Sequence, residues 1–188
     1  TAVLSGAVAW TYHQESHAFY VLTVGDRTWA YDASVGLWHE RAWRDPADGT
    51  LHRHRAQCHM AFANRNIVGD WETGKLYELD LDTYTDNGAP ILRLRAAQTA
   101  EDKQERLFFS SLQIDMETGV GTATGQGLNP QLVLRWSNDG GHTWSNEKMV
   151  SIGKTGEYSA RAKFNRLGQG RNRVWEISMT DQIGRAHV

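Results

Sequence analysis

The stretch that decides the fold is Ser137-Asn138-Asp139-Gly140-Gly141-His142-Thr143-Trp144, which lies between two strand-like segments. It matches the pattern S-x-D-x-G-x-T-W, known as an Asp-box. The fixed positions of that pattern are Ser137, Asp139, Gly141, Thr143 and Trp144. We expect Asp139 to accept hydrogen bonds from backbone amides, Gly141 to adopt a positive φ, and Trp144 to pack onto the core. The motif predicts a structural hairpin turn and by itself predicts no activity.

The composition around this motif predicts an all-β chain. Its 188 residues include eight Trp, six Tyr, five Phe and eighteen Gly but only three Pro. Aromatic residues fit half-buried pleated surfaces, and glycine supplies the turns between strands. The formal net charge of −2 gives no nucleic-acid footprint over the whole chain, and a single cysteine excludes an internal disulfide. Fifteen Arg stand against five Lys, which indicates an assembly protein because Arg is favoured at interfaces.

Two similar units precede the motif, each with the order strand, turn, aromatic strand, turn, strand. The first lies within residues 7–44 and the second begins near Arg55 and ends near Leu79. A period of about 40 residues is typical of a propeller blade. The chain starts at Thr1 as though in mid-strand, so we expect it to be a fragment of a longer protein. We expect no membrane segment, because no apolar run is long enough to span a bilayer.

After the second unit the pattern changes, which predicts a domain boundary. We interpret residues 1–95 as propeller-blade-like units, 96–104 as a connector and 105–188 as a small antiparallel β-sandwich. Strands are expected over 107–116 and 131–136, and over 147–152, 158–164 and 173–179. The alternation in 131–136 places Leu132, Leu134 and Trp136 on one face. The predicted fold is therefore propeller-like blades followed by a sandwich that carries the Asp-box hairpin.

Two chemical alternatives arise from the residues. Asp-boxes are best known from sialidases, and Asp115 and Glu117 form a carboxylate pair, but two blade-like units do not assemble a glycosidase pocket. In a single strand, His52, His54 and Cys58 would share a face that suits zinc. No second Cys/His pair has ligand spacing, so we predict no metal, no cofactor and no catalytic residue.

A basic run near the end of the chain is the candidate contact surface. It contains no acidic residue and comprises Arg161, Lys163, Arg166, Arg171 and Arg173. We interpret it as a subunit interface for an acidic partner, with a solvated sheet edge or contact with DNA phosphates as alternatives.

With these residues in view, the chain resembles the C-terminal part of the packaged-DNA stabilisation proteins of short-tailed phages, which form the tail hub. The matching stretches run in order along nearly the whole chain. They include 6–10, 27–32, 36–41, 77–86, 115–121, 134–144 and 166–171.

The resemblance implies a non-enzymatic virion protein that is assembled in the host cytoplasm. It would form a ring of several copies, close the portal channel after packaging and retain the DNA. The implied partners are other copies, the portal adaptor, the tail needle and tailspikes. The alternative is an Asp-box carbohydrate-active or glycan-binding propeller domain of the sialidase kind.

Overall fold

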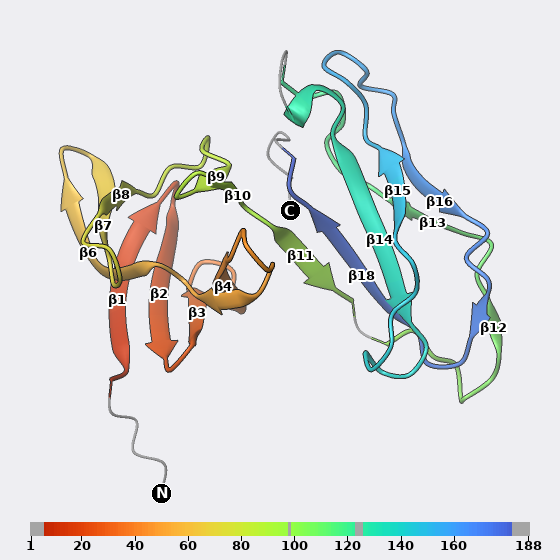
Figure 1. The fold of residues 1–188 in the computed structure, drawn as a ribbon. Coiled ribbons are helices and arrows are strands. Elements are labelled where there is room, and N and C mark those ends of the chain that lie inside the picture. Colours follow the sequence, from red (N-terminus) through yellow and green to blue (C-terminus); the bar gives the residue numbers. More distant parts are fainter. Residues whose placement is uncertain (1–5, 98, 123–125, 182–188) are drawn as a thin grey trace, which may run out of the picture. The chain divides into compact units, whose positions relative to one another are not determined.

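The computed structural model describes residues 6–97, 99–122 and 126–181, and it is built of β-strands with one short 3₁₀ turn, η1 (Gln126–Leu128) (Figure 1). The all-β prediction is confirmed. The chain divides into two compact units, 1–91 and 92–188, which are described separately. Across the described residues, no helix is long and apolar enough to cross a membrane.

The first unit opens with a five-stranded antiparallel meander in which each strand pairs with the next. Its strands are β1 (Val8–Gln14), β2 (His17–Val24), β3 (Arg27–Asp32), β4 (Leu37–Arg44) and β5 (Leu51–Arg53). The turn between β3 and β4 forms because the Asp32 carboxylate accepts the Ser34 amide at 2.9 Å and Gly36 has φ +77°. The inward face buries Tyr12, Val21 and Ala30.

A second meander completes the first unit. It consists of β6 (Ala56–Phe62), β7 (Arg65–Asp70) and β8 (Leu76–Glu78), followed by a hairpin of β9 (Thr85–Asp86) and β10 (Ala89–Pro90). The two meanders pack through β1 and β6, where the His59 ring stacks on Trp10 at 5.5 Å. Hydrogen bonds from Asn66 Nδ2 to the His13 carbonyl, from Gln14 Nε2 to the Leu79 carbonyl and from Arg53 Nη2 to Gln57 Oε1 also connect them.

The second unit is the antiparallel sandwich. One sheet has the order β11-β18-β14-β15, and the other side is formed by the pairs β13-β16 and β12-β17 (Figure 1). The bounds are β11 (Arg93–Ala96), β12 (Leu107–Phe108), β13 (Ser111–Ile114), β14 (Gln131–Ser137), β15 (Lys148–Ser151), β16 (Ala162–Asn165), β17 (Gln169–Gly170) and β18 (Val174–Met179).

The core of the sandwich lies between these layers. Leu132 and Leu134 are buried, and Trp136 packs against the same cluster, as the alternation predicts. Phe164 of β16 and Ile152, which directly follows β15, complete the cluster. Burial of each such side chain stabilises the fold by roughly 1.5–3 kcal/mol.

The boundary between the units differs from the predicted connector. Residues 93–96 form β11 and pair with β18, so they belong to the second unit, which begins at Leu92. Within the expected connector 96–104, Ala100 exchanges backbone hydrogen bonds with Arg173, while residue 98 lies outside the described residues. Pairing with a strand near the other end of the unit is a contact that local composition does not reveal.

The strand predicted over 107–116 is divided into β12 and β13. Opposite the break, between β16 and β17, Arg166 and Gly168 have φ +57° and +72°. This segment therefore bulges away from regular strand pairing, and the Phe109 amide donates to the Gly168 carbonyl there. The strand predicted over 158–164 is the shorter β16, which starts only at Ala162.

Candidate interface surfaces

The turn at 137–144 is held by side-chain oxygens that bond the backbone. Ser137 Oγ accepts the Gly141 amide at 2.8 Å, and Asp139 Oδ1 accepts the Thr143 amide at 2.9 Å. The hydroxyls of Ser137 and Thr143 donate to the same carboxylate at 2.6 and 2.5 Å. These donors lower the pKa of Asp139 well below its ordinary range. A carboxylate engaged in this way is a structural acceptor rather than a general acid.

The glycine and tryptophan of the motif have separate roles. Gly141 has φ +99°, in the region that favours glycine. Trp144 is only half-buried, and the Arg135 guanidinium lies 4.7 Å from the centre of its ring. Arg135 in turn pairs with Glu176. The expected packing of Trp144 onto the core is therefore replaced by a cation–π contact with Arg135 of β14.

Arg173 is buried, which differs from its expected place in a contact surface. Its exposed fraction is 1%, and its three nitrogens donate to Asn138 Oδ1, the Leu167 carbonyl and the Gln169 carbonyl at 2.9, 2.6 and 2.7 Å. Burial lowers the pKa of Arg173. The guanidinium lies within cation–π distance of the rings of Phe109, Trp136 and Trp175. Arg173 therefore joins the turn at 137–144 to the backbone of Leu167 and Gln169, at the start of β17.

The other four basic residues of the run are exposed: Arg161, Lys163, Arg166 and Arg171. We call them the basic row. On β16, Lys163 and Asn165 point outward while Ala162 and Phe164 point into the core. Arg171 Nη1 donates to the Gln104 carbonyl at 3.2 Å. In the part of the chain that the structure describes, none of the four forms an ion pair with a carboxylate.

The histidine segment does not form the single strand that a shared zinc-binding face would need. His52 lies in β5, His54 follows that strand, and Cys58 lies in β6 beyond a register shift. The His52 ring bonds Thr50 and lies 3.5 Å from Asp26, and His54 Nδ1 accepts the Ala56 amide. Burial and the nearby charge of Arg41 lower the pKa of His54 to about 4.

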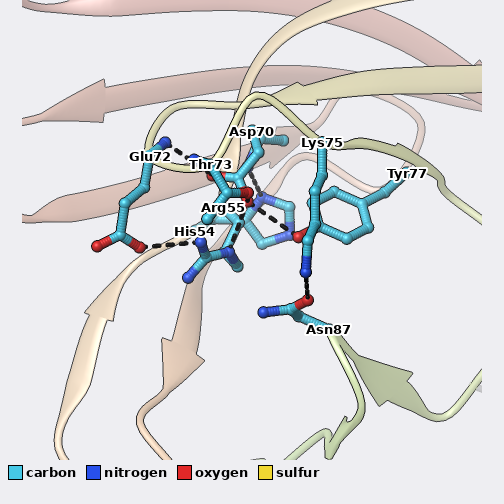
Figure 2. Close-up of polar contacts among 9 residues, drawn as sticks. His54, Arg55, Asp70, Glu72, Thr73, Lys75, Tyr77 and Asn87 are labelled. Atoms are coloured by element: carbon cyan, nitrogen blue, oxygen red, sulfur yellow. Dashed lines mark hydrogen bonds and ion pairs between the residues drawn. The ribbon is translucent and has the colours of Figure 1, made fainter.

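Beside His54 lies a polar cluster that sequence reasoning missed (Figure 2). Arg55 Nε donates to Asp70 and Arg55 Nη2 to Glu72, each at 2.9 Å, and Arg55 and the Asp70 carboxylate are buried. Asp70 also accepts the hydroxyls of Thr73 and Tyr77 at 2.7 and 2.9 Å. These donors outweigh burial and hold the pKa of Asp70 far below its ordinary value. The cluster fixes the turn between β7 and β8 and leaves Arg55 committed to two carboxylates.

The Asp115 and Glu117 pair follows β13 rather than lying on it. Asp115 is exposed and accepts a hydrogen bond from Gln113 Nε2 at 3.0 Å, while Glu117 is half-buried. The arrangement is that of a solvated strand end.

A family model described as the bacteriophage P22 Gp10 β-sandwich matches residues 93–186, half of the chain. The chain belongs to this family. The match begins at β11 and covers the sandwich described above, so the resemblance to the tail hub proteins of short-tailed phages is confirmed. The P22 Gp10 family consists of structural phage tail proteins, which makes this chain a component of the virion.

No curated protein matches the chain. One solved structure that it resembles is the crystal structure of an exo-β-1,3-galactanase from Phanerochaete chrysosporium with galactose. The identity is 10% and the TM-score 0.27, with 95% of this chain and 54% of the other covered. The chain thus spans about half the length of that enzyme, and a likeness this weak carries no functional argument.

Proposed function

We propose that this chain acts without catalysis, as part of a tail hub that closes the portal channel and retains the packaged DNA. It would act by binding its partners: other copies of itself in a ring, the portal adaptor, the tail needle and the tailspikes. Membership of a family of structural tail proteins supports the class of function.

The basic row is the observation that carries the proposed subunit contact. Four exposed cations follow one another from the residue before β16 to the turn before β18, and within the described ranges none of them pairs with a carboxylate. A cation row of this kind gives specificity and fast association with an acidic surface. An acidic patch on a neighbouring tail subunit is therefore the preferred partner, ahead of DNA phosphates.

The test is a phage that carries Arg166→Glu together with Arg171→Glu. Both side chains are exposed, so the chain should fold normally, whereas two reversed charges oppose an acidic partner. We expect purified particles that lack the protein and whose DNA is lost to nuclease after packaging. Arg106→Glu, an exposed charge reversal outside the basic row, is the matched control and should leave particles intact.

Particles of the double variant that keep both the protein and nuclease-protected DNA would overturn the proposed contact. Particles that retain the protein but lose DNA would instead assign the basic row to DNA.

A further inference from the structure

The sandwich of the second unit has an open side, between β11 and β13. β11 is the edge strand of the sheet β11-β18-β14-β15, and among the described strands it pairs with β18 alone (Figure 1). In the other layer, β13 pairs only with β16 in the described part of the chain. No backbone pairing within the described ranges joins β11 to β13, so the two layers lack a closing strand on this side.

The free edge of β11 offers backbone groups for one more strand. The Ala97 amide donates to the Trp175 carbonyl at 2.8 Å, and in an antiparallel ladder this arrangement repeats at every second residue. Arg95 therefore also directs its backbone groups to β18. Leu94 and Ala96 direct theirs to the open edge. Unpaired N–H and C=O groups of this kind are a template for strand addition.

The side of β11 that faces the core carries arginine rather than apolar residues. Residues that pair directly across an antiparallel ladder point to the same face. Arg95 pairs with Ile177, which packs against the core cluster. Arg93 pairs with Met179 of that cluster, and its Nη2 donates to the Asp181 carbonyl. The exposed Arg95 guanidinium has neither a hydrogen-bond acceptor nor an ion pair among the residues that the structure describes.

Two apolar cavities lie on either side of Arg95 along β11, and Arg95 and Ile177 line both. The cavity toward Ala97 has a volume of about 190 Å³, and its other apolar lining residues are Leu112, Ile114 and Trp175. The cavity toward Arg93 has a volume of about 180 Å³, and its other apolar lining residues are Leu94, Met116, Leu132 and Met179. The open side therefore offers two apolar sites with one unpaired cation between them.

We propose that the open side binds an extended segment of a neighbouring protein, which adds to β11 as a further antiparallel strand. The other pairings of this sheet are antiparallel too. Side chains of a strand alternate between its two faces, so every second residue of the segment would point into the sandwich.

The unpaired cation and the two cavities define the sequence of that segment. A carboxylate directly opposite Arg95, at the cross-strand spacing of about 4.5–5.5 Å between Cβ atoms, would neutralise the guanidinium. The residues two positions before and after the carboxylate would then place apolar side chains in the two cavities. The ligand is thus a segment with an apolar, an acidic and an apolar residue at alternate positions.

An inward-pointing charge on an edge strand also serves in some proteins as a guard against strand addition. The two roles of Arg95 make opposite predictions. A guard opposes every added strand, so neutralising it should strengthen binding, whereas neutralising the partner of a carboxylate should weaken it. The cavities favour the second role, because a guard needs no apolar space on either side of it.

The experiment is a fluorescence anisotropy titration of the full chain with the fluorescein-labelled peptide Ser-Thr-Val-Thr-Glu-Thr-Val-Thr-Ser. We expect saturable binding to the unaltered chain. Binding to Arg95→Gln should be at least about 10-fold weaker, the effect of losing one hydrogen bond between charged groups. Arg106→Gln, an exposed arginine of the same unit that lines neither cavity, is the matched control and should bind like the parent.

Two further measurements separate the carboxylate contact from the strand pairing. Arg95→Glu should prefer a peptide in which lysine replaces glutamate, which reverses the preference of the parent. N-methylation of the two threonines beside glutamate should abolish binding, because their amides would bond Leu94 and Ala96. N-methylation of glutamate itself is the control and should leave binding intact, because that amide would point away from β11.

An unaltered chain that shows no saturable binding would overturn the proposal. Tighter binding by Arg95→Gln would overturn it too and make Arg95 a guard. Equal binding of the two kinds of N-methylated peptide would exclude strand addition. The inference does not rest on the basic row or on the proposed tail function, so this titration and the charge reversal at Arg166 and Arg171 succeed or fail separately.

Discussion

Arg173 gives the strongest prediction about stability, because it is a buried cation that pairs with no carboxylate among the residues the structure describes. Replacing it by Met keeps the unbranched stem and removes all the donors. Asn138 Oδ1 and the carbonyls of Leu167 and Gln169 then lose their hydrogen bonds, of which the bond to Leu167 is buried and the other two are part-buried. Each hydrogen bond to a charged donor contributes about 1.5–3 kcal/mol, so the loss of three sums to roughly 4.5–9 kcal/mol.

Part of that loss is offset, because burying a neutral Met side chain avoids the desolvation of the charged guanidinium, which costs several kcal/mol. We therefore expect Arg173→Met to lower the free energy of unfolding of the second unit by about 2–4 kcal/mol. Arg173→Lys should lose at least as much, since an ammonium keeps the buried charge and cannot reproduce three separately directed N–H donors.

The assay is native-state hydrogen exchange, read by mass spectrometry on peptides from β14 and β18, which reports the second unit without the first. Arg161→Met, an exposed arginine in the same unit, is the control and should change stability by less than about 0.5 kcal/mol. A stabilised Met variant, or a Lys variant as stable as the parent, would refute the view that the three hydrogen bonds outweigh the cost of burying the charge.

Two further predictions concern Trp144 and His54. Trp144→Ala should lower the free energy of unfolding of the second unit by about 1–2 kcal/mol, below the roughly 3–5 kcal/mol typical of a fully buried ring. The reason is that Trp144 is half-exposed beneath Arg135. A loss of about 4 kcal/mol, measured by hydrogen exchange, would contradict this. His54 has a folded pKa of about 4 against an ordinary 6.5, so the unfolded chain binds more protons between these values. The stability contributed by neutral His54 is complete above pH 6.5 and should fall by roughly 2–3 kcal/mol as pH drops to 4. The free energy of unfolding of the first unit, measured in urea, should lose this part of its pH dependence in His54→Gln. It should keep this pH dependence in the control His142→Gln, which changes an exposed histidine of the second unit. An unchanged pH profile in His54→Gln would contradict the assignment.

Much of the fold is predictable from local pattern. The strand predicted over 131–136 is β14 (Gln131–Ser137), and the alternation that places Leu132 and Leu134 in the core is correct, since both signals depend only on neighbouring residues. The break at Phe109 depends on the backbone of Arg166 and Gly168 far along the chain, so the sequence around it gives no sign.

The exposure of the basic run was predictable only in part. The exposure of the four cations of the basic row could be predicted, because no acidic residue lies between them to form an ion pair. Arg173 shares that pattern, yet the rings of Phe109, Trp136 and Trp175 and the side chain of Asn138 surround it. Only tertiary structure separates a buried arginine from an exposed one, although Asn138 at a variable position of the Asp-box offers a local hint.

The central claim is that this chain works through its surfaces as a component of the phage tail. A cryo-electron microscopy map of the assembled tail tests it most directly. We predict density for another tail subunit, with acidic side chains, against the basic row. A map in which Arg161, Lys163, Arg166 and Arg171 all lie against solvent would contradict the account.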